Sequence, residues 1–453
     1  MFTSLNPATE ELLGEWPDHT ADDVERKLTI AQTTFQTWKH TTIEQRSQLF
    51  RVLANNLRTQ ARTLGELATR EMGKTITSAM AEIEKCALGC EYYAAQTANF
   101  LAPEVIETDA SRSEIRYEPL GPILAVMPWN FPFWQVLRFA APALMAGNVG
   151  LLKHASNVPQ CALALEKLFL EAGFPEGVFQ TLLVRASAIE GIIRDPRIKA
   201  VTLTGSEPAG RDVGRIAGEE IKPSVLELGG SDPFIIFPDA DLDLAVSTAI
   251  TARLQNNGQS CIAAKRFLIH TTIAEAFTKK FIEGFEAMKI GDPMDESTQI
   301  GPLASAKLRT DLDDQVKRSV AAGARILTGG KYVGDKGFFY APTILADVKS
   351  GVPAYHEELF GPVATLMIFE TLPEAINLAN DTDFGLGASV WTKDVDIIEH
   401  CSQNLEAGSV FVNGMVKSIP SLPFGGLKHS GYGRELGWEG MRAFLNVKSV
   451  WVK

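Results

Sequence analysis

The chain has 453 residues, which is longer than one hydrophobic core usually serves, so we expect two or more domains. Hydrophobic residues make up 45% of the sequence and charged residues 22%, which is the composition of an ordinary soluble globular protein. The net charge of -12, with no cluster of lysine and arginine, argues against nucleic acid as a partner, because phosphate binding needs concentrated positive charge.

The cysteine count and the apolar segments indicate where in the cell the protein is expected. Five cysteines do not form a disulfide framework, and the odd number leaves a thiol free, so we expect a reducing, cytoplasmic location. No charged segment followed by an apolar core opens the chain, so no signal peptide is predicted. The most apolar region, residues 119–152, is interrupted by prolines, Asn130 and Arg138, and therefore predicts a protein core and no membrane span.

The first predicted elements are helices. From Thr20 to about Leu101 apolar residues recur at helical spacing, which predicts a helical bundle. Short β-rich runs then alternate with amphipathic segments, as in βαβ units on a parallel sheet with both faces covered. The expected strands are 122–127, 149–153, 178–184, 200–204 and 224–228, and the expected helices are 133–145, 158–172 and 207–219.

A second alternating series follows Gly229 and Gly230 and predicts a second α/β domain. Residues 447–452 predict a last strand near the end of the chain. The strands expected in the second series are 234–237, 266–269, 343–345 and 364–369, and its helices are 241–255 and 273–287.

Cys261 is the most informative residue, because it follows a loop rich in glycine and amide side chains, residues 255–260. A thiol there is a candidate nucleophile, whereas an isolated cysteine is more often a small buried hydrophobe. Two other residues favour the nucleophile. Glu227 lies inside an apolar strand, where a carboxylate needs a partner or a function, and Asn130 lies among aromatic residues and prolines.

Together these segments resemble the aldehyde dehydrogenase superfamily, over nearly the whole chain and in the family's order. The resemblance implies an α/β fold with a Rossmann-like cofactor domain (1–103 and 119–228), an α/β catalytic domain (229–430) and a β oligomerisation arm (104–118 and 443–453), in a homodimer or homotetramer. The motifs that carry it are Pro128-Trp129-Asn130-Phe131-Pro132, Thr204-Gly205-Ser206, Glu227-Leu228-Gly229-Gly230, Gly258-Gln259-Ser260-Cys261 and Glu358-Leu359-Phe360-Gly361-Pro362-Val363.

The resemblance also implies catalytic roles. Cys261 attacks the aldehyde carbon, and hydride then passes to a nicotinamide, which leaves a thioester. Asn130 and the Cys261 backbone N–H stabilise the substrate oxygen, although Asn130 alone could be a turn residue. Glu227 activates water to hydrolyse the thioester; the alternative is a structural salt bridge. No histidine spacing predicts a metal site, so we expect none.

Two segments of the chain are expected to contribute to the cofactor site. No G-x-G-x-x-G follows a strand, but Thr204, Gly205 and Ser206 stand where a strand ends and a helix begins, which favours an anion. The alternative there is a simple capped helix. Lys153 ends another strand, and Ser156 occupies a position where many NAD-using relatives carry Glu. Without that acid to repel a 2′-phosphate, we expect NADP, with NAD possible but weaker. Trp129, Leu228, Glu358 and Phe360 complete the expected cofactor contacts, the last two against the nicotinamide ribose.

The expected substrate is succinate semialdehyde. Arg138 stands where relatives that act on this compound carry an arginine, and Trp134 and Ser418 are expected to line the same pocket. A second arginine common in that group is absent, because Gln255 stands there. Alternatives are glutarate semialdehyde, an aliphatic aldehyde, a structural salt bridge for Arg138, or a non-catalytic structural protein of the same fold.

Overall fold

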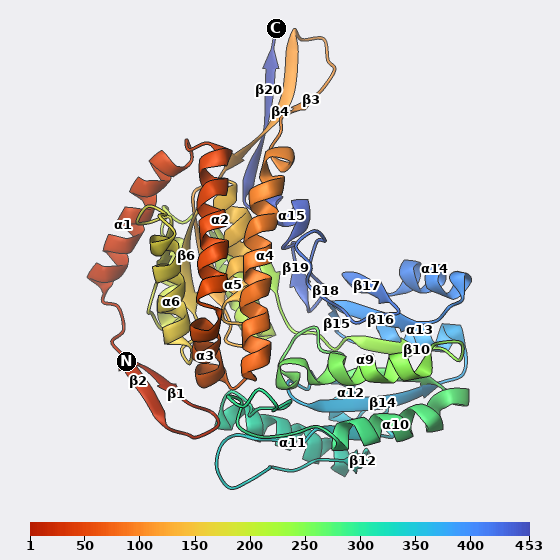
Figure 1. Cartoon of the computed structure of the whole chain (residues 1–453). Coiled ribbons are helices and arrows are strands. Elements are labelled where there is room, and N and C mark those ends of the chain that lie inside the picture. The colour runs from red at the N-terminus through yellow and green to blue at the C-terminus, as the bar shows by residue number, and fades with distance from the viewer.

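The helical bundle follows a short hairpin at the N-terminus. The computed structural model describes residues 1–453 (Figure 1). Thr20 and Thr42 are the N-caps of the helices that start at Ala21 and Ile43. Each forms a capping box, in which the threonine side-chain oxygen accepts from the third helical N–H. No sequence pattern predicted the hairpin. The elements are β1 (Phe2–Leu5), β2 (Leu12–Trp16), α1 (Ala21–Trp38), α2 (Ile43–Thr59), α3 (Ala61–Met72) and α4 (Ile76–Phe100).

A six-stranded sheet packs against this bundle in the order β19-β9-β8-β5-β6-β7. Every pair is parallel except β19 on β9, and the crossover helices confirm the predicted α/β fold. The strands are β5 (Pro122–Met127), β6 (Val149–His154), β7 (Phe179–Thr181), β8 (Ala200–Thr204), β9 (Ser224–Glu227) and β19 (Gly431–Tyr432), and the helices are α5 (Trp134–Met145), α6 (Pro159–Glu171), α7 (Ile189–Arg194) and α8 (Glu207–Glu219).

A seven-stranded sheet forms the second α/β unit, in the order β12-β13-β14-β11-β10-β16-β17, with only β12 antiparallel to its neighbour. Its two faces have separate apolar cores: Ile235 and Leu268 face one, and Phe234 and Phe267 face the other. The strands are β10 (Pro233–Ile236), β11 (Arg266–His270), β12 (Arg325–Thr328), β13 (Thr343–Ala346), β14 (Val363–Phe369), β16 (Gly387–Trp391) and β17 (Ser409–Val412), and the helices are α9 (Leu242–Leu254), α10 (Ala274–Glu286), α11 (Ala306–Ala321), α12 (Pro353–His356), α13 (Leu372–Asn380) and α14 (Val395–Asn404).

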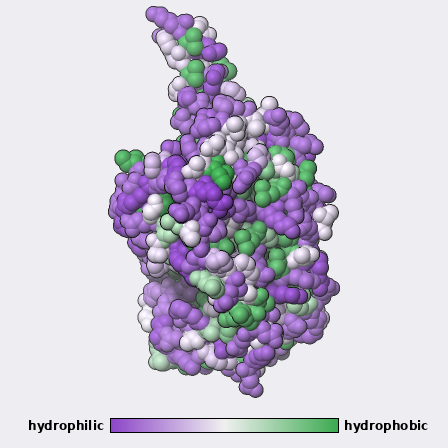
Figure 2. Space-filling model, turned by 90° about the vertical axis from the view of Figure 1, so that its left-hand side faces the viewer, coloured by the Kyte–Doolittle hydropathy of each residue, from purple (hydrophilic) through white to green (hydrophobic).

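A three-stranded arm projects from the body, at the top of Figures 1 and 2. It is built from β3 (Glu104–Val105), β4 (Arg112–Pro119) and β20 (Leu445–Val452), with β4 in the middle. The outer strand β20 leaves Val447 55% and Trp451 52% exposed. The remaining elements are β15 (Phe384–Gly385), β18 (Leu427–Lys428) and α15 (Gly437–Arg442). None of the helices combines the length and the apolar character needed to span a bilayer.

Candidate active site

The loop that carries the cysteine has an unusual backbone. After α9 ends, Asn256 (φ 53°), Asn257 (φ 57°) and Gly258 (φ 73°) all adopt left-handed conformations. Asparagine and glycine tolerate this region better than other residues. A Cβ atom on Gly258 would lie 2.3 Å from the backbone of Gly361, so the loop is packed too tightly for a side chain at this position. The amide-rich sequence is therefore a requirement of the turn that presents Cys261.

Buried side chains hold this turn in place. The Asn256 side-chain amide donates to the carbonyl oxygens of Asn130 (2.8 Å) and Gln259 (3.0 Å). The fully buried Arg253 donates to the carbonyl oxygens of Gly258 (2.6 Å) and Ala264 (3.1 Å). These bonds also tie the cysteine loop to the Asn130 segment, so their relative position is fixed before any ligand binds.

Cys261 lies where two cavities meet. One cavity, of about 310 Å³, is lined by Trp134, Arg138 and Ser418, and the other, of about 270 Å³, is lined by predicted cofactor residues. Cys261 and Gln135 border both cavities. Burial raises the pKa of Cys261 to about 12, while Arg138 and Lys265 lower it less. The positive charges of Arg138 and Lys265 favour the thiolate, but burial outweighs them and favours the protonated thiol.

Two hydrogen-bond donors are available beside the thiol. Asn130 is almost fully buried, and its side-chain nitrogen donates to the Gln259 carbonyl oxygen (3.0 Å), which leaves its second hydrogen free. The Cys261 backbone N–H donates to no backbone carbonyl or side chain. Fixed donors of this kind can stabilise a negatively charged substrate oxygen without reorganising.

Glu227 is a buried carboxylate at the end of β9. Its side chain is 2% exposed, and neither oxygen has a hydrogen-bond partner or forms an ion pair. Burial raises its pKa well above the ordinary value, and the carboxylate of Glu435 raises it further, while Arg138 and Arg434 lower it. Glu227 therefore does not form the structural salt bridge that was its alternative role. Glu435 was missed in the sequence, because no local pattern distinguishes it from an exposed acid.

Arg138 lines the first cavity, but its charge is already compensated. Its side chain is 3% exposed and forms a close ion pair with Glu435. It also donates to the Thr204 hydroxyl (3.2 Å), and its guanidinium lies 4.6 Å from the centre of the Phe424 ring. The salt bridge that was the alternative role for Arg138 is thus present in the structure.

The Ser418 hydroxyl joins two other side chains of this cavity. Its oxygen accepts from the Trp134 indole N–H (3.0 Å) and from the Lys85 ammonium (2.6 Å). Lys85 was not predicted, because it comes from α4, far from the other residues in sequence, and its pattern there is that of an ordinary helix face. Gln255, where a second arginine was considered, also borders the cavity.

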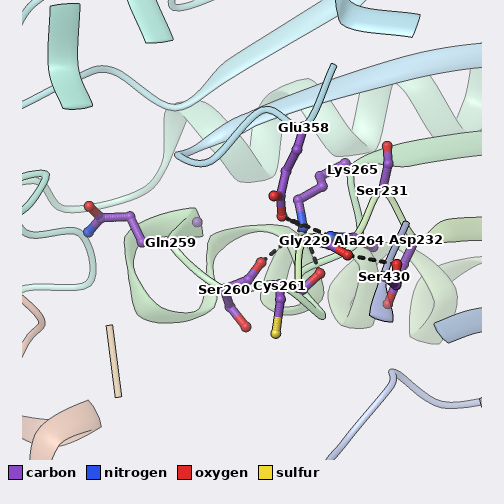
Figure 3. Close-up of polar contacts among 12 residues, drawn as sticks. Gly229, Ser231, Asp232, Gln259, Ser260, Cys261, Ala264, Lys265, Glu358 and Ser430 are labelled. Carbon is purple, nitrogen blue, oxygen red and sulfur yellow. Dashed lines mark hydrogen bonds and ion pairs between the residues drawn. The ribbon is translucent and has the colours of Figure 1, made fainter. Parts of the chain in front are cut away.

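The second cavity gathers most of the predicted cofactor residues: Trp129, Thr204, Gly205, Ser206, Leu228, Glu358 and Phe360. Glu358 accepts from the Gly230 N–H (3.1 Å) and pairs with the buried Lys265 (3.2 Å). Lys265 also donates to the carbonyl oxygens of Ser260 (3.0 Å) and Cys261 (2.7 Å), while the Cys261 sulfur points away from it (Figure 3). One lysine therefore connects the cysteine loop with the expected ribose-binding carboxylate.

The remaining cofactor residues fit an anionic dinucleotide. The Ser206 side chain makes no capping hydrogen bond at the start of α8, so its hydroxyl and the first N–H groups of this 13-residue helix are available to a phosphate. Lys153 is the penultimate residue of β6 and has no acidic partner, and burial lowers its pKa. Ser156 is exposed just beyond it. This donor set contains no carboxylate at Ser156 that would repel a 2′-phosphate.

A thiol between two cavities, with an adjoining amide donor and a buried unpaired carboxylate, is an arrangement suited to oxidising a carbonyl carbon beside a bound dinucleotide. The aldehyde dehydrogenase family model matches residues 1–450, and the chain belongs to this family. The family resemblance seen in the sequence is confirmed.

Several relatives match the chain over its full length, among them two mycobacterial enzymes. Succinate-semialdehyde dehydrogenase (NADP+) of Mycobacterium leprae is 52% identical over 454 residues, which are 100% of this chain and 99% of the relative. Succinate-semialdehyde dehydrogenase (NADP+) 1 of Mycobacterium ulcerans is 54% identical over 455 residues, which are 100% of this chain and 99% of the relative. The crystal structure of succinic semialdehyde dehydrogenase from Streptococcus pyogenes in complex with NADP+ has a TM-score of 0.98 at 36% identity and covers 100% of both chains.

Proposed function

We propose that this protein oxidises succinate semialdehyde to succinate with NADP as the hydride acceptor. The observation that carries the proposal is the position of Cys261 between a cavity lined by cationic and aromatic side chains and a cavity lined by the expected cofactor residues. The names of the Mycobacterium and Streptococcus relatives support the same substrate and cofactor. Glutarate semialdehyde and aliphatic aldehydes are the alternative substrates. A non-catalytic role is disfavoured because Cys261, Glu227 and Asn130 are all present.

In this mechanism the Cys261 thiol gives its proton to solvent water, and its sulfur attacks the aldehyde carbon. The Asn130 side chain and the Cys261 N–H hold the resulting oxyanion. Bound NADP supplies the acceptor for the hydride that leaves this carbon. Glu227 then removes a proton from water, which attacks the thioester and frees Cys261. One aldehyde, one water and NADP+ give one carboxylate, NADPH and two protons.

The proposed binding residues fall on the two sides of Cys261. Trp134, Arg138 and Ser418 contact the substrate on one side. On the other side, Glu358 and Phe360 hold the nicotinamide ribose, with Trp129 and Leu228 beside it. Farther along the cofactor, Thr204, Gly205 and Ser206 bind the pyrophosphate, and Lys153 and Ser156 bind the adenosine ribose and its 2′-phosphate.

The test is an assay of reduced-cofactor formation by the purified protein with a panel of aldehydes. We expect the highest kcat/KM for succinate semialdehyde with NADP, and no turnover by Cys261→Ala. Ser156→Glu should shift the preference toward NAD, because its carboxylate repels the 2′-phosphate. A wild-type protein that strongly prefers NAD, or one that oxidises neutral aldehydes better than succinate semialdehyde, would contradict the proposal. Turnover by Cys261→Ala near the wild-type rate would rule out the covalent mechanism.

We further propose a cytoplasmic homodimer or homotetramer in which the arm pairs with a neighbouring copy. An exposed edge strand offers unpaired N–H and C=O groups, and β20 adds exposed apolar side chains to them. The reducing compartment follows from five free cysteines, four of which are buried.

A further inference from the structure

The charges around the substrate cavity are unequally compensated. Arg138 is paired with Glu435, whereas no carboxylate lies within ion-pair distance of Lys85. Lys417 also borders the cavity, but its side chain is exposed to solvent. Lys85 is half-buried and lies among aromatic side chains, where an unpaired cation attracts an anion more strongly than it would in water. The available positive charge of this cavity is therefore that of Lys85.

The hydrogen bonds around Ser418 point to the same ligand. A serine hydroxyl has two acceptor sites and one donor, and here both acceptor sites are filled by the Lys85 and Trp134 donors. The hydroxyl proton has no protein acceptor. Lys85 has two further N–H donors beyond the one it gives to Ser418. The pair therefore presents only donors to the cavity, together with one positive charge, which matches a carboxylate.

Packing fixes this arrangement. The Lys85 ammonium lies 4.4 Å from the centre of the Trp134 ring. One helical turn further along α4, a Cβ atom on Gly89 would lie 3.1 Å from the same indole, so the glycine lets the ring lie close against the helix. The indole is thus held on its face by Lys85, at its edge by Gly89 and through its N–H by Ser418.

We propose that Lys85, together with the Ser418 hydroxyl, binds the distal carboxylate of the substrate and determines the preference for carboxylated aldehydes. This inference rests on the proposed function and names the residue that recognises the substrate's acid group. Arg138 remains a wall of the cavity, with its charge shared with Glu435.

The experiment compares Lys85→Met, which keeps the apolar stem and removes the charge, with wild type on succinate semialdehyde and on a neutral four-carbon aldehyde. We expect kcat/KM for succinate semialdehyde to fall roughly 10- to 150-fold, mainly through KM, because a hydrogen bond to a charged group is lost. The neutral aldehyde should change less than about 3-fold. Lys85→Arg should restore part of the preference. Lys167→Met, on the exposed side of α6, is the matched control.

Parallel losses on both aldehydes, or a selective loss in Lys417→Met with none in Lys85→Met, would overturn the assignment of Lys85 while leaving the proposed function intact. If wild type prefers another carboxylated aldehyde and Lys85→Met selectively loses that one, the substrate is wrong and the role of Lys85 stands. A wild type that prefers neutral aldehydes throughout overturns both.

Discussion

Among single residues, Glu227 combines deep burial with an unpaired carboxylate. We predict that Glu227→Gln leaves an initial burst of reduced cofactor, one per active site, followed by slow turnover, because thioester hydrolysis loses its base while thiol attack does not. Rapid-mixing absorbance of the reduced cofactor measures both phases. The exposed Glu44→Gln is the control. Equal loss of burst and steady state would instead indicate a structural role for the carboxylate.

The raised pKa of Glu227 determines in which direction the deacylation rate changes with pH. Burial and Glu435 raise the pKa of Glu227, so the basic form is scarce at low pH and increases as the pH rises through the raised pKa. The deacylation rate should therefore rise with pH in wild type, and this rise should be absent from Glu227→Gln. Single-turnover rates measured across the pH range check this, and an identical rise in the variant would assign the titration to another group.

Lys85 should produce the opposite pH dependence. Burial, followed by the charge of Arg138, lowers the pKa of Lys85 to about 8, and Glu82 beside it is engaged with Lys74. The cation that binds a carboxylate exists below this pKa and is lost above it, so kcat/KM for succinate semialdehyde should fall as the pH rises through about 8. The ratio of kcat/KM for succinate semialdehyde to kcat/KM for a neutral aldehyde isolates this effect. A ratio that stays constant in wild type, or falls equally in Lys85→Met, would contradict the assignment.

At the scale of elements, one buried ion pair positions α5. The Glu82 carboxylate on α4 forms a close ion pair with the buried Lys74 and accepts from the backbone N–H groups of Phe133 and Trp134, both at 2.8 Å, where α5 begins. An acceptor at a helix N-terminus satisfies donors that have no partner within the helix. The pair therefore orients the helix that carries Trp134 and Arg138.

We predict that Lys74→Met destabilises the fold by about 3 to 5 kcal/mol, because it leaves the Glu82 charge buried without its cation. The double variant Lys74→Met/Glu82→Gln should lose less than Lys74→Met alone, since no charge is then left unpaired. Urea unfolding measures these two variants and the single variant Glu82→Gln, and the exposed Lys307→Met is the control. A double variant that loses as much as the sum of the two single variants would show that the two side chains act independently.

The elements were more predictable than the site. Periodicity located α8 at residues 207–219 and β5 at residues 122–127, because each pattern is local. Glu435 and Lys85 could not be found in this way. Each faces the site only because α4 and the segment after β19 fold against α5, and their sequence surroundings resemble those of exposed residues. The charge compensation of Arg138 depends on the same tertiary contact.

For the molecule as a whole, the arm predicts the assembly. Three strands alone bury little apolar surface. The outer strand β20 also has no partner on one edge and exposes Val447 and Trp451. We predict that wild type is a homodimer or homotetramer and that Val447→Asp/Trp451→Asp reduces its mass, because buried charges oppose pairing of the strands. Light scattering after size-exclusion chromatography measures the mass. Val395→Asp, at an exposed apolar position on α14, is the control and should leave the mass unchanged. A monomeric wild type, or the same loss of mass in Val395→Asp, would contradict an interface at the arm.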